Sequence, residues 1–219
     1  MAATDLETFE PLILPRARRV PHALLDQAIR NVLREFCQWT RAWQYVPTAQ
    51  TISDATASYT LQLPGSYAEP VAVEWASVDG SPSIPKPVEW LDEHIPTWRT
   101  RVADDFSYFT QLTPQTMVFA AVPDNAGTSG GFRYRLSLKP TIGATQTDDS
   151  MFNDWGEVVA DGVVAKLLGM EGETWTNLAA AKTAANEYRI GKTKARIRAQ
   201  KSFANADQNW GAKYTFAGR

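Results

Sequence analysis

Apolar positions recur at helical spacing over residues 21–45, and this stretch is the clearest element that the sequence predicts. Polar side chains fill the positions between them, so the helix should have one apolar face. Pro21 suits the first helical position, and Pro47 is expected to end the element. The apolar stripe consists of Leu25, Ala28, Ile29, Val32, Leu33, Phe36, Trp39 and Trp43.

The preceding segment, residues 1–20, lacks this period. Pro11 and Pro15 interrupt it, and a cluster of arginines follows them. We therefore expect an extended N-terminal arm that lies on another surface and has no core of its own. The arginines are Arg16, Arg18 and Arg19.

Residues 47–150 differ in character, because threonine, serine, valine, tyrosine, proline and glycine become frequent. These residue types favour strands and turns. Alternation is clearest over residues 132–140, where apolar side chains face one way and arginines the other. A short helix is expected over residues 87–99. The candidate strands are residues 58–63, 71–78, 106–112, 116–122 and 132–140.

Helical spacing returns after a polar linker at residues 141–150. Asn153 or Asp154 is expected to cap a helix that runs to about Leu168. Small residues around Gly162 would let a second helix approach this one closely.

A last helix is predicted from about Thr174 or Thr176 to about Ser202. Its apolar face is rich in alanine, and Gly191 is interpreted as a weak point within it. Helical periodicity is then lost over residues 203–219.

These elements predict an α+β fold in which residues 21–46 and 151–202 form a helical bundle. Residues 47–150 would be an inserted antiparallel β-rich subdomain. Residues 1–20 and 203–219 would be extended arms.

Motifs that carry common chemistry are absent from the sequence. It has no phosphate-binding glycine loop, no dinucleotide-binding turn and no cysteine or histidine spacing that suits zinc. The glycines within residues 127–131 have no following lysine or helix, so we interpret them as a hairpin loop. Cys37 falls in the middle of the first helix, beside its apolar stripe, and is expected to be a buried, inert thiol.

The remaining titratable groups also favour structural readings. His94 could act as a general base, but a solvated surface position is the simpler interpretation, and His22 is expected to be a local surface group. The carboxylate pairs at 104–105 and 148–149 fall in predicted turns, which offer no contrast of environments for acid–base work. We predict no catalytic residue, metal site or cofactor, and no enzymatic activity.

The sequence also indicates where the protein works. One cysteine allows no internal disulfide, and no apolar run approaches the ~20 residues of a membrane helix. The N-terminus opens with acidic residues, which argues against a signal peptide. We expect a soluble, non-secreted protein of a reducing cytoplasm with no membrane partner.

Positive charge is concentrated near the end of the chain. Residues 182–219 hold nine lysines and arginines but only Glu187 and Asp207, so this segment carries +7 and the remainder −9. A docking element for an acidic protein partner explains this best. Contact with DNA phosphates and a merely solvated helix face are the alternatives. The candidate docking residues are Arg189, Lys192, Lys194, Arg196, Arg198 and Lys201.

The final residues, 203–219, carry more aromatic side chains than a free tail would expose. Such residues anchor a segment that orders on a partner, although the tail could instead fold back onto its own chain. The candidate anchors are Phe203, Trp210, Tyr214 and Phe216.

Residues 14–43 read LPRARRVPHALLDQAIRNVLREFCQWTRAW and resemble the start of podovirus-type phage head-to-tail adaptor proteins. Those proteins open with a proline-marked lead-in and a helix of the form A-x-x-x-x-x-R-E-F-C-x-x-[ST]-x-x-W. The strand-rich middle and Trp175, ahead of an alanine-rich helix, fit the same pattern. The matching motif residues are Ala28, Arg34, Glu35, Phe36, Cys37, Thr40 and Trp43.

The resemblance implies a virion protein, assembled in the host cytoplasm, that forms a ring of usually twelve copies below the portal. The ring would extend the DNA channel and support the tail nozzle or tube. Genomic DNA would pass through it without sequence-specific binding. Residues 203–219 and the basic helix before them would attach to the portal protein.

Three other functions remain open at this point. A tail-tube or tail-completion protein would polymerise without a portal. A DNA-binding module that uses the basic C-terminal helix would bind free DNA with a steep salt dependence. An enzyme would need a constellation of residues that the sequence does not reveal.

Overall fold

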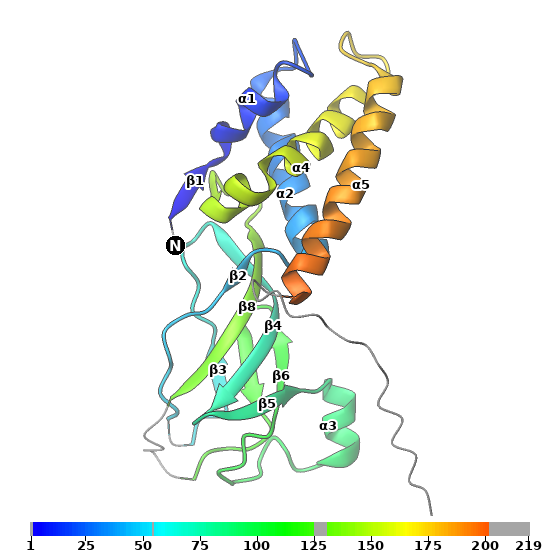
Figure 1. The fold of residues 1–219 in the computed structure, drawn as a ribbon. Coiled ribbons are helices and arrows are strands. Elements are labelled where there is room, and N and C mark those ends of the chain that lie inside the picture. Colours follow the sequence, from blue (N-terminus) through cyan, green and yellow to red (C-terminus); the bar gives the residue numbers. More distant parts are fainter. Residues whose placement is uncertain (1, 54, 125–130, 202–219) are drawn as a thin grey trace, which may run out of the picture.

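The computed structural model describes residues 2–53, 55–124 and 131–201. Helices gather at one end of the molecule and a curled sheet forms the other, which is the predicted α+β fold (Figure 1). In chain order the elements are β1 (Ala3–Asp5), the 3₁₀ helix η1 (Leu6–Phe9), α1 (Glu10–Ile13), α2 (His22–Thr40), β2 (Gln44–Tyr45), β3 (Ser58–Thr60), β4 (Ala68–Val78), β5 (Ser81–Pro85), α3 (Val88–His94), β6 (Tyr108–Thr113), β7 (Thr116–Phe119), β8 (Phe132–Pro140), β9 (Gln146–Asp148), α4 (Asp149–Leu168) and α5 (Leu178–Lys201).

Helix α2 buries most of the predicted apolar stripe, from Leu25 to Phe36. It ends five residues earlier than expected, because Arg41 takes a left-handed conformation (φ 56°) and its N–H bonds the carbonyl of Cys37 at 2.9 Å. Trp39 was placed on the buried stripe, and this was wrong: its side chain is exposed. Trp43 is fully buried, but it lies beyond the helix and stacks on Tyr67.

The N-terminal segment is not the extended, coreless arm that the prolines indicated. Strand β1 pairs with β9, and η1 and α1 follow it directly. Phe9 and Ile13 are fully buried, and the Phe9 ring meets the Phe152 ring edge-on at 5.2 Å. Pro11 lies in the first turn of α1, where a missing N–H costs nothing, so proline was a poor indicator of extended chain here.

Helices α4 and α5 pack on each other and both contact α2. Glycines make this crossing possible. A Cβ at Gly162 would lie 2.7 Å from Val32 Cγ1 and 2.8 Å from Tyr188 Cε2, and a Cβ at Gly191 would overlap Val158. Gly191 is therefore a point of close contact between α5 and α4, which gives a packing reason for a residue that helix propensity disfavours.

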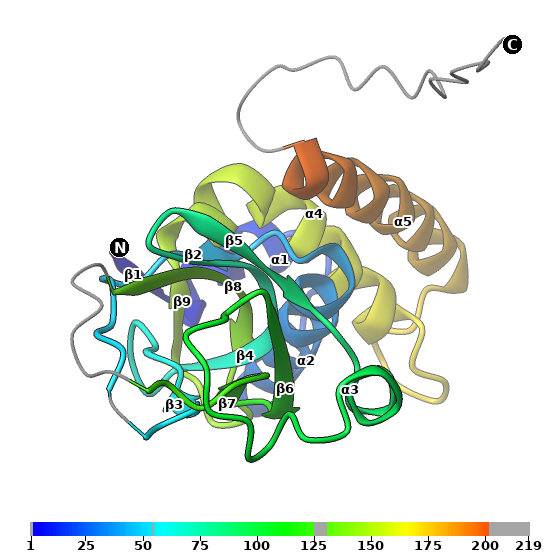
Figure 2. The ribbon, with the colours of Figure 1, turned by 90° about the horizontal axis from the view of Figure 1, so that it is seen from below.

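The main sheet has the strand order β2-β8-β4-β5-β6-β7-β3 and curls strongly (Figure 2). Its strands pair antiparallel except β5 and β6, which are parallel, so the sheet is mixed and not purely antiparallel as predicted. The segment containing α3 connects those two strands and supplies the crossover that a parallel pair requires. Strand β8 has the predicted bounds, and its apolar side chains are fully buried.

One hydrophobic cluster runs without a break from the helices into the interior of the sheet. Phe36 of α2, Val163 of α4 and Phe132 of β8 all belong to it. A small second cluster lies under α3 around Leu91 and Trp98. The continuous core joins the helices to the sheet, and the assignment of residues 47–150 as an inserted subdomain stays a prediction.

Candidate docking surface

Helix α5 carries the described part of the predicted docking surface, and its buried face holds it firmly in place. The residues on that face are small except for Tyr188, whose hydroxyl donates to the carbonyl of Val32. At the N-terminal end, Asn177 Oδ1 accepts the N–H of Ala180 at 3.1 Å. At the other end, Gln44 Nε2 donates to the carbonyl of Ala199 at 3.1 Å. The helix is thus fixed along its length against α2, α4 and β2.

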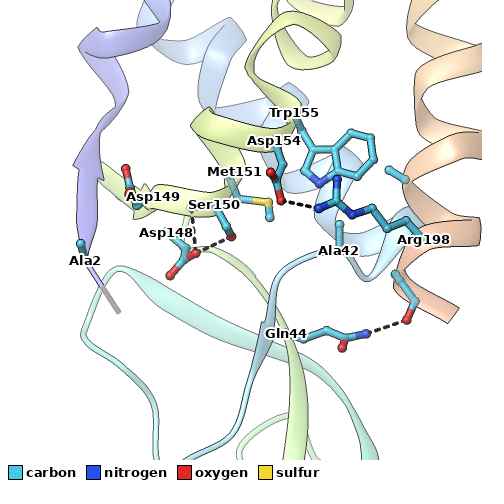
Figure 3. Close-up of a pocket in the computed structure, with 12 residues that line it drawn as sticks. Ala2, Ala42, Gln44, Asp148, Asp149, Ser150, Met151, Asp154, Trp155 and Arg198 are labelled. Carbon is cyan, nitrogen blue, oxygen red and sulfur yellow. Dashed lines mark hydrogen bonds and ion pairs between the residues drawn. The ribbon is translucent and has the colours of Figure 1, made fainter. Parts of the chain in front are cut away.

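Two of the predicted docking cations have partners within the chain. Lys192 Nζ lies 2.7 Å from Glu35 Oε1 and 4.5 Å from the centre of the Tyr188 ring. Arg198 lies 3.3 Å from Asp154 Oδ2 and over the Trp155 ring (Figure 3). These two cations attach α5 to α2 and α4, and a role for them in docking stays a prediction.

The other predicted cations of α5 point to solvent. Arg189, Lys194, Arg196 and Lys201 are exposed and form no ion pair within the described residues. The Arg196 guanidinium lies 5.0 Å from the centre of the exposed Trp39 ring. Such a cation–π contact holds the tryptophan in place without covering it.

Two isoleucines lie among these cations. Ile190 is 44% exposed and Ile197 is 47% exposed, and their seven-residue spacing places them on one face of the helix. Sequence reasoning singled out the charged residues and missed these two isoleucines. The alanines at helical spacing already explained the buried face, so no further apolar residue was sought on the exposed one. We call Trp39, Arg189, Ile190, Arg196 and Ile197 together the basic surface.

A pocket of about 360 Å³ lies where α5 ends, between the first turn of α4 and β2 (Figure 3). Its carboxylates all have partners: Asp148 accepts the N–H of Ser150, Asp149 accepts the Thr4 hydroxyl, and Asp154 pairs with Arg198. Asp148 is buried and caps α4, so the reading of residues 148–149 as a solvated turn was wrong. These contacts are structural and leave no free acid–base pair in the pocket.

The other residues weighed for catalysis lie in surroundings that fit a structural or a surface role. Cys37 is fully buried, 3.7 Å from Met151 Sδ, and burial together with the nearby charge of Asp148 raises the pKa of its thiol. His22 and His94 are exposed. Hydrogen bonds from Ser107 hold the pKa of Asp105 below its usual value. No three His, Cys, Asp or Glu side chains are grouped to hold a metal ion in the part of the chain that the structure describes.

The aromatic candidates of the tail, Phe203, Trp210, Tyr214 and Phe216, lie outside the described residues. Lys201, the last described residue, is where α5 ends beside the pocket of Figure 3. None of the described helices is both long enough and apolar enough to cross a bilayer.

The sequence model of the SU10 adaptor protein family matches residues 1–211, which is nearly the whole chain. The chain belongs to this family. It is therefore a phage adaptor-type protein and a virion component, from a family whose members are structural proteins. A comparison with curated proteins finds no match. The resemblance seen in residues 14–43 thus led to the right kind of protein, and the podovirus subtype stays a prediction.

Proposed function

We propose that this SU10 adaptor family protein joins the portal of a phage head to the tail by forming a ring under the portal. Membership of the adaptor family is the observation that carries this proposal. The surface of α5 supports it, because unpaired cations beside exposed isoleucines and a tryptophan are features of a protein-binding surface. Ring formation from twelve copies and the podovirus subtype belong to the proposal.

Attachment to the portal is assigned to the C-terminal end of α5 and to the segment that follows it. Lys194 and Lys201 are exposed and unpaired within the described residues, near the point where residues 203–219 begin. A charged helix end would steer the chain towards an acidic partner, and aromatic residues would then supply the anchoring contacts.

The ring would extend the channel through which genomic DNA leaves the head. Residues 1–181 carry −9. A negative surface suits a channel in which DNA must slide, since attraction to phosphates would retard it. The distal side of the ring would support the tail nozzle or tube.

Truncation tests the portal attachment. We expect a chain that lacks residues 203–219 to keep the helix content and melting temperature of the full chain, because residues between Leu6 and Ala195 already form a continuous hydrophobic core. It should no longer copurify with the tagged portal protein of the same phage. Equal recovery of the truncated and full chains on the portal would contradict this assignment.

A second candidate function is non-specific DNA binding through α5, favoured by the unpaired cations Arg189, Lys194, Arg196 and Lys201. It predicts affinity for free duplex DNA that falls steeply as salt rises, with one unit of slope for about each phosphate contacted. Absence of binding at low salt would remove this candidate and leave the adaptor proposal unaffected.

A further inference from the structure

We propose that neighbouring copies contact each other head to tail, with the basic surface of one copy against an acidic surface at the N-terminal side of the next. This inference rests on the ring of the proposed function and names the surfaces that build it. The occupant of the basic surface is thus a second copy of this chain, whereas portal attachment is left to the end of α5 and residues 203–219.

The acidic surface surrounds a pocket of about 250 Å³ beside η1. Three carboxylates line it, from Asp5, Glu7 and Asp26, together with one guanidinium, from Arg30. None of the three carboxylates forms an ion pair with another described residue, although Asp5 accepts a hydrogen bond from Gln146 Nε2 at 3.0 Å. The pocket therefore carries uncompensated negative charge in a concave site that a cationic side chain of another copy can enter.

The loop that helps to line this pocket also carries an exposed apolar residue. Ile142 is 76% exposed in the loop between β8 and β9. The same loop lines the pocket through Ala144 and Thr145, and the Thr145 carbonyl accepts the N–H of Leu6 at 2.9 Å. Each surface thus has unpaired charge and an element that carries an exposed isoleucine, and the two charges are opposite in sign. Burying both together would compensate the charges and remove apolar area from water.

The positions of the two surfaces suit a ring. Figures 1 and 2 both place β1 and η1 on one side of the helical layer and α5 on the other, with α2 and α4 between them. A surface that binds a different surface on the opposite side of the next copy is a heterologous interface. Such interfaces close into rings when the rotation between copies allows it.

Some exposed charges of the helical layer are matched within the chain. Arg16 pairs with Asp161 at 2.6 Å and Lys192 pairs with Glu35 at 2.7 Å. The carboxylates of the acidic surface and the arginines of the basic surface have no such ion pair among the described residues, so their charge is left for a partner.

Charge reversal on each side tests the proposal. The first variant is R189E/R196E, in which both surfaces are acidic, and the second is D5K/E7K, in which both are basic. All four residues are exposed, so both variants should fold, which circular dichroism melting would verify. Alone, each variant should form at least about ten-fold fewer oligomers than the wild type, because like charges now face each other.

Mixing the two variants should restore assembly. Every interface of an alternating ring would then pair an acidic surface with a basic one. The matched control is R133E/K166E, which changes the net charge as the first variant does. Arg133 and Lys166 are exposed and lie outside both surfaces, so this control should assemble like the wild type.

Two measurements are made. The first is native mass spectrometry of the complex with the portal, and the second is sedimentation of the concentrated protein at low ionic strength without the portal, which strengthens the contact between opposite charges. Recovery of oligomers in the mixture, but not in either variant alone, would establish the head-to-tail contact. Unchanged assembly of the single variants, or no recovery on mixing in either measurement, would overturn it. Failure of the wild type to bind the portal would overturn the proposed function instead, while the measurement without portal would still decide this inference.

Discussion

At Gly162 the crossing of three helices depends on the absence of a side chain. The α-carbon faces Val32 of α2 on one side and Tyr188 of α5 on the other, and both would be closer than 3.0 Å to a methyl group placed there. In an isolated helix alanine is more favourable than glycine by about 1 kcal/mol. Packing in the folded protein reverses that preference.

We expect Gly162→Ala to lower the free energy of unfolding by about 1–3 kcal/mol, since the added methyl group must displace two packed side chains. Urea unfolding followed by circular dichroism measures this. Gly143→Ala is the matched control, because nothing lies within 4 Å of a Cβ at that position. A Gly162→Ala protein as stable as the wild type would show that the helices do not cross as described.

Cys37 links burial to a pH dependence. Its folded-state pKa is raised, first by burial and then by the charge of Asp148, so the thiol stays protonated in the folded chain. In the unfolded chain the thiol ionises near pH 8.5. Above that pH the Cys37 thiol holds its proton in the folded state and loses it in the unfolded state. Its contribution to the free energy of unfolding therefore falls as pH rises.

Cys37→Ala should therefore cost about 1 kcal/mol at pH 7, from lost packing, and leave portal binding unchanged. The difference in unfolding free energy between wild type and variant should shrink by up to about 1.4 kcal/mol for each pH unit above 8.5. Chemical unfolding at a series of pH values measures it, and the tyrosines, shared by both proteins, cancel. A pH-independent difference would mean that the thiol is not buried, and loss of portal binding in a folded variant would reopen a reactive role.

At the scale of elements, the start of α4 shows what limits sequence-based prediction. Helical spacing indicated a cap at Asn153 or Asp154, but the helix begins at Asp149 and Asp148 is its cap. The cap could not be recognised from local sequence, because Asp148 also ends β9, whose pairing with β1 places it there. Tertiary pairing, and not helix periodicity, sets this boundary.

Asp148→Ala should lower the free energy of unfolding by about 1 kcal/mol, because the N–H of Ser150 loses its acceptor at the helix start. Asn153→Ala, at the position that periodicity favoured, should change it by less than about 0.5 kcal/mol. Thermal melting of the two variants side by side compares them. Equal losses would contradict the assignment of Asp148 as the cap.

How well a strand could be predicted depended on how much of one face it buries in the core. Strand β8 alternates strictly because one face lies in the core, and its bounds were predicted correctly. Strand β5, with prolines at both Pro82 and Pro85, has one buried residue and a parallel partner, so its sequence carries little strand signal.

The cations of the docking surface were visible in the sequence. The partners of Lys192 and Arg198, and the exposure of Trp39, depend on how helices from distant segments meet.

For the whole molecule, the arrangement of charge is the property that the adaptor proposal uses. One continuous core joins the helices and the sheet, and α5 presents cations and isoleucines on one side. Carboxylates without an ion pair among the described residues line the opposite side. A chain built in this way can join copies of itself side by side and still leave its C-terminal end free to bind another protein.

Mass photometry of the purified chain, alone and mixed with the portal protein of the same phage, tests the central claim most directly. At the high dilution of this measurement and at physiological salt, where the contact between copies alone is weak, the account predicts a 24.3 kDa monomer on its own. With the portal present, it predicts a complex heavier than the portal by the mass of one fixed number of copies, expected to be twelve. Long polymers formed without the portal under these dilute conditions would favour a tube protein. A monomer that is indifferent to the portal would contradict the account.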